Sequence, residues 1–152
     1  WLNPNADPEG TGYQVVHGLL ALGSGGINGR GLGASREKWG TLPEAHTDFI
    51  FAVLGEETGL FGTLMVLVLF TAIVLMALRV ARMSQDRFVQ LASFGIGAWM
   101  ATQMVVNIGA VLQVLPVTGV PLPLVSYGGS SLIPSLVAMG ILMSFAKSTA
   151  AR

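Results

Sequence analysis

Three stretches of the chain lack charged side chains and are rich in apolar residues. They cover residues 58–78, 88–115 and 132–146. A helix rises about 1.5 Å per residue, so roughly 20 apolar residues cross the ~30 Å hydrocarbon core of a bilayer. The first two stretches reach that length, and the third is shorter. The pattern predicts an all-α polytopic membrane protein with three transmembrane helices.

The segments outside these stretches hold most of the polar, proline and glycine residues. Residues 1–57 form a large loop, in which residues 13–22 space their apolar positions as a short amphipathic helix does. Residues 116–131 interrupt the chain with prolines and glycines but carry no charge. We expect this second loop to dip back into membrane that protein covers, because irregular backbone is tolerated there only under such cover.

The positions of the cationic residues predict the orientation. Residues 39–78 contain no lysine or arginine, whereas cations follow the first and third spans, at Arg79, Arg82, Arg87, Lys147 and Arg152. Cytoplasmic segments carry an excess of lysine and arginine. The chain therefore divides into an extracytoplasmic part, residues 1–57, and a membrane part, residues 58–152, whose loop 116–131 also faces outward.

The composition narrows the possible classes of protein. Hydrophobic residues make up 52% of the chain and charged residues 11%, with a net charge of zero. No basic patch of the kind that nucleic acid requires is present, so we expect no nucleic-acid partner. The absence of cysteine excludes a disulfide framework and thiolate metal sites. Because the chain starts at Trp1, we expect it to begin within a longer protein.

Five ionisable side chains gather just before the first span. They lie in the run LPEAHTDFIFAVLGEE, residues 42–57, and are Glu44, His46, Asp48, Glu56 and Glu57. A charge beside hydrocarbon is costly unless it is solvated or paired, so ionisable groups there indicate function. Glu44, His46 and Asp48 alternate, so an extended segment would turn all three to one side. For Glu56 and Glu57 we favour a plainer role as caps of a helix N-terminus.

A glycine-rich segment precedes this run. Residues 23–33 read GSGGINGRGLG, and Arg30, Arg36 and Lys38 add cations within and after it. Two interpretations stay open. The segment is either a flexible loop whose turns need positive φ, or a cradle of backbone N–H groups for a phosphate. The three cations favour anion binding slightly.

Three motifs together resemble one known family. They are GSGGINGRGLGAS at residues 23–35, LPEAHTDFIFAVLGEE at 42–57 and VPLPLVSYGGSSL at 120–132. In this order they resemble the peptidoglycan polymerases of the shape, elongation, division and sporulation family, and the FtsW members more than the RodA members. The resemblance covers nearly the whole chain. That family has about ten transmembrane helices, of which this sequence supplies only the last few.

The resemblance implies a reaction on lipid II at the outer face of the bacterial cytoplasmic membrane, at the division septum. Asp48 matches the aspartate of the family's HTDF motif and is the expected catalytic base. Expected substrate-binding residues are Arg36, Lys38, Glu44, His46, Ser126, Tyr127, Gly128, Gly129 and Ser130. A divalent cation, Mg²⁺ or Mn²⁺, is a possible cofactor, with Glu44 and Asp48 as possible ligands. Expected partners are a class B penicillin-binding protein transpeptidase and other division proteins.

Other functions fit parts of the same pattern. Glu44, His46, Asp48 and Glu56 are metal-ligand types that an intramembrane hydrolase uses, but the chain lacks the H-E-x-x-H motif. A transporter of lipid II would use the same groove without needing a base. A polymerase of cell elongation, of the RodA type, is a further alternative. The segment from Ser126 to Ser130 also fits a plain tight turn between two helices.

Overall fold

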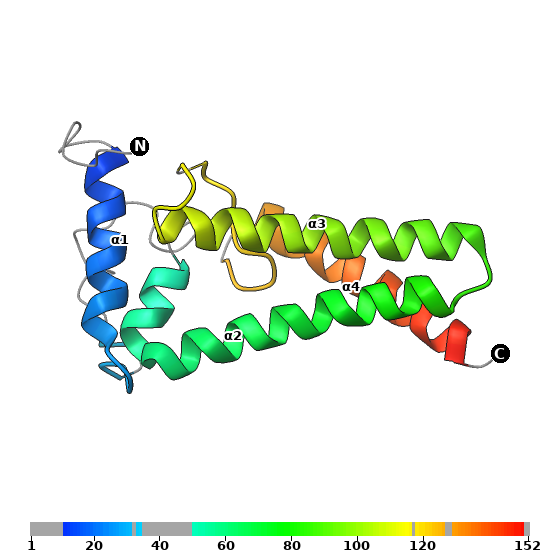
Figure 1. The fold of residues 1–152 in the computed structure, drawn as a ribbon, viewed down its shortest axis with the longest axis horizontal. Helices are drawn as coiled ribbons and strands as arrows, with labels where there is room; N and C mark the ends of the chain where they lie inside the picture. The colour runs from blue at the N-terminus through cyan, green and yellow to red at the C-terminus, as the bar shows by residue number, and fades with distance from the viewer. Residues whose placement is uncertain (1–10, 32, 35–49, 117, 127–128, 151–152) are drawn as a thin grey trace.

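The computed structural model describes residues 11–31, 33–34, 50–116, 118–126 and 129–150. Its regular elements are α1 (Thr11–Gly25), α2 (Ile50–Met83), α3 (Arg87–Val111) and α4 (Gly129–Ala150). In the described part of the chain every regular element is helical (Figure 1). The last three helices are long and apolar enough to cross a membrane. The predicted fold class, with three spanning helices and a short helix before them, is confirmed.

Helices α2 and α3 form an antiparallel hairpin along the long axis of the molecule (Figure 1). Their connection is short because Asp86 caps α3, its carboxylate accepting a 2.8 Å hydrogen bond from the Phe88 N–H. The side-chain amide of Gln90 closes the turn by donating from Nε2 to the Ser84 carbonyl at 2.7 Å. Helix α1 lies crosswise at the opposite end of the hairpin, against the start of α2.

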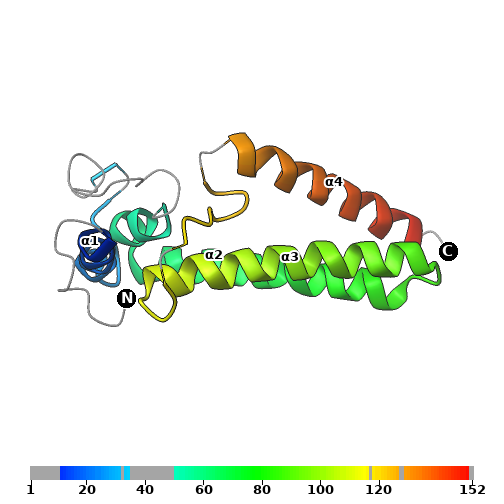
Figure 2. The ribbon, with the colours of Figure 1, turned by 90° about the horizontal axis from the view of Figure 1, so that it is seen from above.

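Helix α4 meets the hairpin at one end and diverges from it toward the other (Figure 2). The contact is a small apolar cluster in which Leu142 packs with Ala77 and Val80 of α2. Phe145 adds an edge-to-face contact with Phe88, with ring centroids 6.3 Å apart. This end of the bundle is the one predicted to face the cytoplasm.

A larger apolar cluster lies at the other end, where all the elements except α4 contribute. Its buried members are Ala21, Phe51, Ala52, Val53, Phe70, Ile108, Val111 and Leu122. The loop after α3 takes part through Leu122, and Asn107 of α3 ties this loop down by donating to the Val120 carbonyl at 2.8 Å. Leu122 and Ser126 are almost fully buried. The middle of this uncharged loop is thus buried, whereas Thr118 and Gly119 are exposed. Its re-entry into the membrane stays a prediction.

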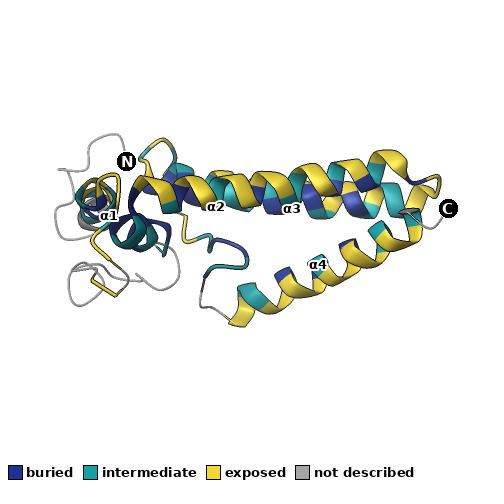
Figure 3. Cartoon of the chain, turned by 90° about the horizontal axis from the view of Figure 1, so that it is seen from below, coloured by how far each residue is buried: buried dark blue, intermediate teal, exposed yellow. Residues whose placement is uncertain are grey.

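Exposed residues line the outward faces of the long helices (Figure 3), and many of them are large and apolar. Phe61, Phe88 and Leu91 are each at least 70% exposed. Hydrocarbon does not penalise such surfaces, whereas water does. These helices therefore span a membrane, and their exposed faces lie against lipid or against further helices.

The helix bounds differ from those expected from the sequence. Helix α2 begins at Ile50 rather than at residue 58, because its first segment is apolar enough to pack into the larger cluster. Helix α3 ends at Val111 rather than at residue 115. Past this end, the Gly109 carbonyl accepts hydrogen bonds from the N–H groups of Val114 and Leu115, so the helical hydrogen-bond pattern stops.

Helix α4 also starts earlier than expected, and this corrects the placement of several residues. Its first residue is Gly129, so Gly129, Ser130 and Ser131 belong to its first turn and not to the loop. A span starting at residue 132 would put Pro134 in the first turn, whereas it lies in the second turn of α4. Proline at that position lacks the N–H that would bond back to the preceding turn.

The orientation can be tested with single introduced cysteines, because the chain contains none. Ile27 lies after α1 and is 73% exposed, and Gln85 is exposed in the turn between α2 and α3. In a cysteine-free background of the full-length protein, we expect a membrane-impermeant thiol reagent to label Ile27→Cys in intact cells. Gln85→Cys is expected to react only after the membrane is permeabilised. The reverse pattern would contradict the orientation.

Candidate functional site

The candidate site lies where helix α2 is broken at Gly59. This residue has φ 69° and ψ −161°, outside the helical region, and it separates a first segment, residues 50–58, from the membrane-crossing segment that follows. Residues with a Cβ atom rarely adopt such a backbone conformation, so the break requires glycine. A Cβ on Gly59 would also overlap the Gly29 nitrogen and the Ile27 carbonyl. The loop after α1 therefore sits directly against the break.

Three backbone hydrogen bonds fix this loop to both sides of the break. The Arg30 N–H donates to the Glu56 carbonyl and the Gly31 N–H to the Glu57 carbonyl, both at 3.0 Å. On the other side, the Leu60 N–H donates to the Gly26 carbonyl at 2.9 Å. Carbonyls and N–H groups that a helix break leaves open are thus paired with the loop. We call residues 25–31 the clamp loop.

The clamp loop approaches α2 closely because a glycine lies at each point of backbone contact. A Cβ on Gly25 would overlap the Gly55 carbonyl, and one on Gly29 would overlap the Glu57 carbonyl. The glycines are therefore needed for packing against α2. The interpretation of this segment as a phosphate cradle is wrong for Gly29, Arg30 and Gly31, because their three N–H groups are already bonded to backbone carbonyls.

An ion pair reinforces the clamp. Arg30 Nη1 lies 3.2 Å from Glu56 Oε1, and the Glu56 side chain is 1% exposed while that of Arg30 is 38% exposed. A buried carboxylate is strongly unfavourable without a partner, so the cation stabilises the charged form at this position. The expected capping role for Glu56 and Glu57 is wrong, because α2 begins at Ile50 and both residues lie at the C-terminal end of its first segment. The Leu60 N–H that follows the break is paired with the Gly26 carbonyl instead.

Glu57 follows Glu56 in the sequence but differs from it in its contacts. Its Oε1 atom is buried and has no hydrogen-bond partner among the described residues. Among the described residues, no three histidine, cysteine, aspartate or glutamate side chains come close enough together to hold a metal ion. The described residues do not by themselves form a metal centre.

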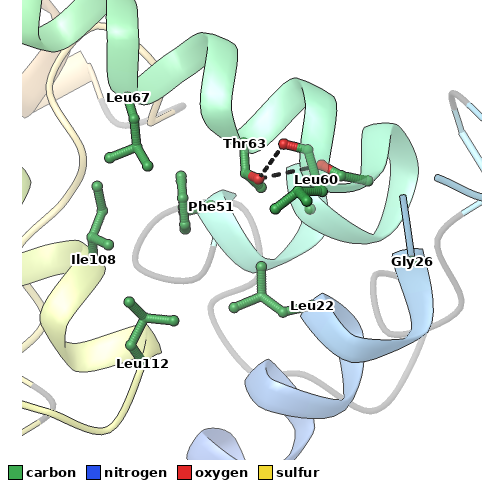
Figure 4. A pocket seen from close by; sticks show the side chains of 10 residues that line it. Leu22, Gly26, Phe51, Leu60, Thr63, Leu67, Ile108 and Leu112 are labelled. Carbon is green, nitrogen blue, oxygen red and sulfur yellow. Dashed lines mark hydrogen bonds between the residues drawn. The ribbon is translucent and has the colours of Figure 1, made fainter. Parts of the chain in front are cut away.

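An apolar hollow of about 260 Å³ opens beside the break (Figure 4). Its walls come from α1, both segments of α2 and the end of α3, and include Leu22, Phe51, Leu60, Leu67, Ile108 and Leu112. Among the described residues that line it, only Thr63 carries a hydroxyl, which donates to the backbone carbonyls of Gly59 and Leu60, at 3.3 and 2.9 Å. Because that hydroxyl is already bonded, the hollow offers an apolar surface to a ligand.

The structure places only some of the expected site residues. Ser126 is buried beside the larger apolar cluster, near Leu122, while Gly129 and Ser130 are exposed on the first turn of α4. Seven expected residues lie outside the described part of the chain, so their placement stays a prediction: Arg36, Lys38, Glu44, His46, Asp48, Tyr127 and Gly128. The Arg30–Glu56 pair was missed, because nothing in a separation of 26 residues marks two side chains as partners.

Comparison with known proteins identifies the family. A family model described as cell cycle protein, FtsW/RodA/SpoVE, matches residues 1–151. The chain belongs to this family. The resemblance carried by the three motifs is therefore confirmed.

Members of the FtsW/RodA/SpoVE family are similar over nearly the whole chain. A probable peptidoglycan glycosyltransferase FtsW of Geobacter metallireducens is 49% identical over 95% of this chain. Stage V sporulation protein E of Bacillus subtilis is 44% identical over 97% of it. The chain spans 38% and 40% of the lengths of these two relatives.

A solved structure shares the fold. It comes from work titled structural coordination of polymerization and crosslinking by a peptidoglycan synthase complex, and it matches with a TM-score of 0.71 and 31% identity. The match covers 96% of this chain and 39% of the solved one. The arrangement of the four helices is thus that of an experimentally known family structure.

The close packing at the break predicts a specific sensitivity to added side chains. Gly59→Ala is expected to lower stability by about 1–3 kcal/mol or more, because alanine is strained at this φ and ψ and also overlaps the clamp loop. Gly95→Ala is the matched control, since Gly95 lies in α3 with open space around it. It is expected to leave stability unchanged or raise it by up to about 1 kcal/mol. Thermal unfolding of the purified full-length variants checks both, and equal midpoints would contradict the clamp.

Proposed function

We propose that this chain is the C-terminal part of a peptidoglycan glycosyltransferase that builds septal cell wall during bacterial division. The observation that carries the proposal is the 49% identity, over 95% of the chain, to a relative named a probable peptidoglycan glycosyltransferase FtsW. Because the chain spans 38% of that relative, the activity belongs to a longer protein. The proposed location is the cytoplasmic membrane, with the reaction at its outer face.

The proposed substrate is lipid II, a disaccharide carried on a lipid diphosphate. A sugar hydroxyl of one molecule attacks the anomeric carbon of another, a new glycosidic bond forms, and the lipid diphosphate leaves. The hydroxyl is a weak nucleophile at neutral pH, so a general base that takes its proton contributes typically about 10²- to 10⁴-fold in rate. Asp48 is the proposed base, and its position two residues before α2 supports a place at the outer end of the bundle.

Other residues are proposed to bind the substrate. Arg36 and Lys38 offer positive charge to the leaving diphosphate, and Glu44 and His46 flank Asp48 in the sequence. The segment from Ser126 to Ser130 offers hydroxyls to the sugar without the desolvation cost of a charge. The apolar hollow beside Gly59 supports a lipid-bearing substrate, because it lies at the end of the membrane helices that we predict to face outward.

A divalent cation and a protein partner belong to the same proposal. Glu44 and Asp48 are oxygen donors of the kind that Mg²⁺ or Mn²⁺ binds, and the cation would offset charge on the diphosphate. The similarity to a chain from a peptidoglycan synthase complex, whose title joins polymerization with crosslinking, supports a transpeptidase partner. A class B penicillin-binding protein is the proposed partner, together with other division proteins.

The role of Asp48 can be tested by an isosteric change. Asp48→Asn in the full-length protein is expected to reduce glycan formation by about 10²-fold or more, because an amide does not take up the hydroxyl proton. Glu44→Gln is expected to have a milder effect. The measurement is polymer formation from lipid II by the purified enzyme with its transpeptidase partner, with thermal stability recorded for each variant.

Asp86→Asn is the matched control for this test. Asp86 caps α3 at the opposite end of the hairpin, and asparagine caps a helix equally well, so activity should remain normal. Normal glycan chains from Asp48→Asn would remove Asp48 from the chemistry. If the full-length wild-type protein moved lipid II across a bilayer without forming polymer, the transporter alternative would replace the polymerase.

A further inference from the structure

The Arg30–Glu56 pair joins two parts of the chain that lie 26 residues apart. Arg30 belongs to the clamp loop after α1, and Glu56 belongs to the first segment of α2, before the break at Gly59. Their side chains are 3.2 Å apart, and their backbones are also bonded, with the Arg30 N–H donating to the Glu56 carbonyl. The same two residues are therefore connected twice, once through the backbone and once through charge.

The first segment of α2 depends on such contacts for its direction. A helix as short as residues 50–58 is marginal by itself and is stable only when packed. One end is held by Phe51, Ala52 and Val53 in the larger apolar cluster. The other end meets the break, where Gly59 allows a change of direction and the helical hydrogen-bond ladder no longer sets the angle. At this end the clamp loop and the ion pair hold the segment in place.

The direction of this segment matters for the proposed reaction through simple chain connectivity. Asp48 precedes Ile50, the first residue of α2, by two positions. The axis of residues 50–58 therefore sets where the chain that carries Asp48 joins the helix. In catalysis, a displacement of about 1 Å in a reacting group costs on the order of 10²-fold in rate.

Stability alone does not account for an ionic contact here. A buried ion pair replaced by apolar groups of similar size is often equally stable or more stable, whereas loss of one partner is costly. The Glu56 side chain is 1% exposed, so its charge is fully subject to this cost. What a charged, hydrogen-bonded pair adds is a fixed distance and angle between the two segments that it joins.

We propose that Arg30 and Glu56 are positioning residues of the glycosyltransferase, which lock the first segment of α2 against the clamp loop and so fix the approach of the catalytic segment. This inference rests on the proposed function. In this proposal neither residue contacts the substrate. Both act on the reaction by fixing the angle between the two segments of α2 at Gly59.

The test distinguishes an effect on the position of the first segment of α2 from an effect on overall stability. In the full-length protein, Arg30→Met removes the charge while keeping most of the side-chain volume, and Arg30→Lys keeps the charge. A double variant, Arg30→Met with Glu56→Gln, removes both charges, so that no buried carboxylate is deprived of the Arg30 cation. Arg82→Met is the matched control, because Arg82 is exposed at the opposite end of α2.

We expect Arg30→Met to lower kcat for glycan formation by about 10- to 100-fold, with KM for lipid II changed by less than about twofold. Arg30→Lys is expected to recover most of the lost kcat. The double variant is expected to regain the thermal midpoint of the wild type but not its kcat. Amide hydrogen exchange in residues 26–31 should accelerate in Arg30→Met and in the double variant, and remain slow in Arg30→Lys and Arg82→Met.

Two results would overturn the positioning role. One is a wild-type kcat in Arg30→Met, and the other is a double variant that regains kcat together with its thermal midpoint, which would show that the pair serves stability only. The proposed function fails separately, if the wild-type protein forms no glycan from lipid II. In that case the hydrogen-exchange comparison still decides whether the pair holds the clamp loop on α2.

Discussion

Burial of the Glu56 carboxylate beside a break in a membrane helix is the constraint on which the end of the molecule that holds α1 depends. A charge at this depth needs a cation, and Arg30 reaches it only because the clamp loop lies against the break. The loop lies there only because glycines at Gly25, Gly29 and Gly59 let two backbones meet. Backbone pairing, glycine content and the ion pair are thus parts of one arrangement.

The two ends of the bundle are built by different rules. At the end that holds α1, the broken α2 and the loop after α3 enclose a shared apolar cluster with it, and the Arg30–Glu56 pair lies at the same end. At the other end, a small apolar cluster of described residues joins α4 to the hairpin. Helix α4 diverges from the hairpin (Figure 2), and apolar residues such as Ile133, Leu136 and Val137 are exposed on it. Such faces suit a chain that spans about two fifths of the length of its relatives. Chemistry is expected where the packing is dense and polar groups are buried.

The sequence predicts the spanning helices well because an apolar run of some 20 residues without charge is rare outside membrane spans. It predicts their ends less well. Residues 50–57 combine an apolar run with two glutamates, which is typical of a loop boundary, yet the Arg30 side chain makes Glu56 compatible with a buried helix. Gly129 and Ser130 look like loop residues beside Gly128 but start α4. In the first case a contact distant in the sequence decides the outcome, and in the second a run of glycine and serine fits a loop and a helix start equally well.

The clamp loop also limits how this family member is able to bind a diphosphate. A glycine nest binds an anion through successive backbone N–H groups that point to one spot. Here the N–H groups of Gly29, Arg30 and Gly31 all donate to carbonyls of the chain itself, so they are not available to a phosphate. The guanidinium of Arg30 is engaged by Glu56 as well. In the proposed reaction, the charge on the leaving group therefore falls to side chains that follow the clamp loop, Arg36 and Lys38, or to a bound cation, rather than to the glycine backbone.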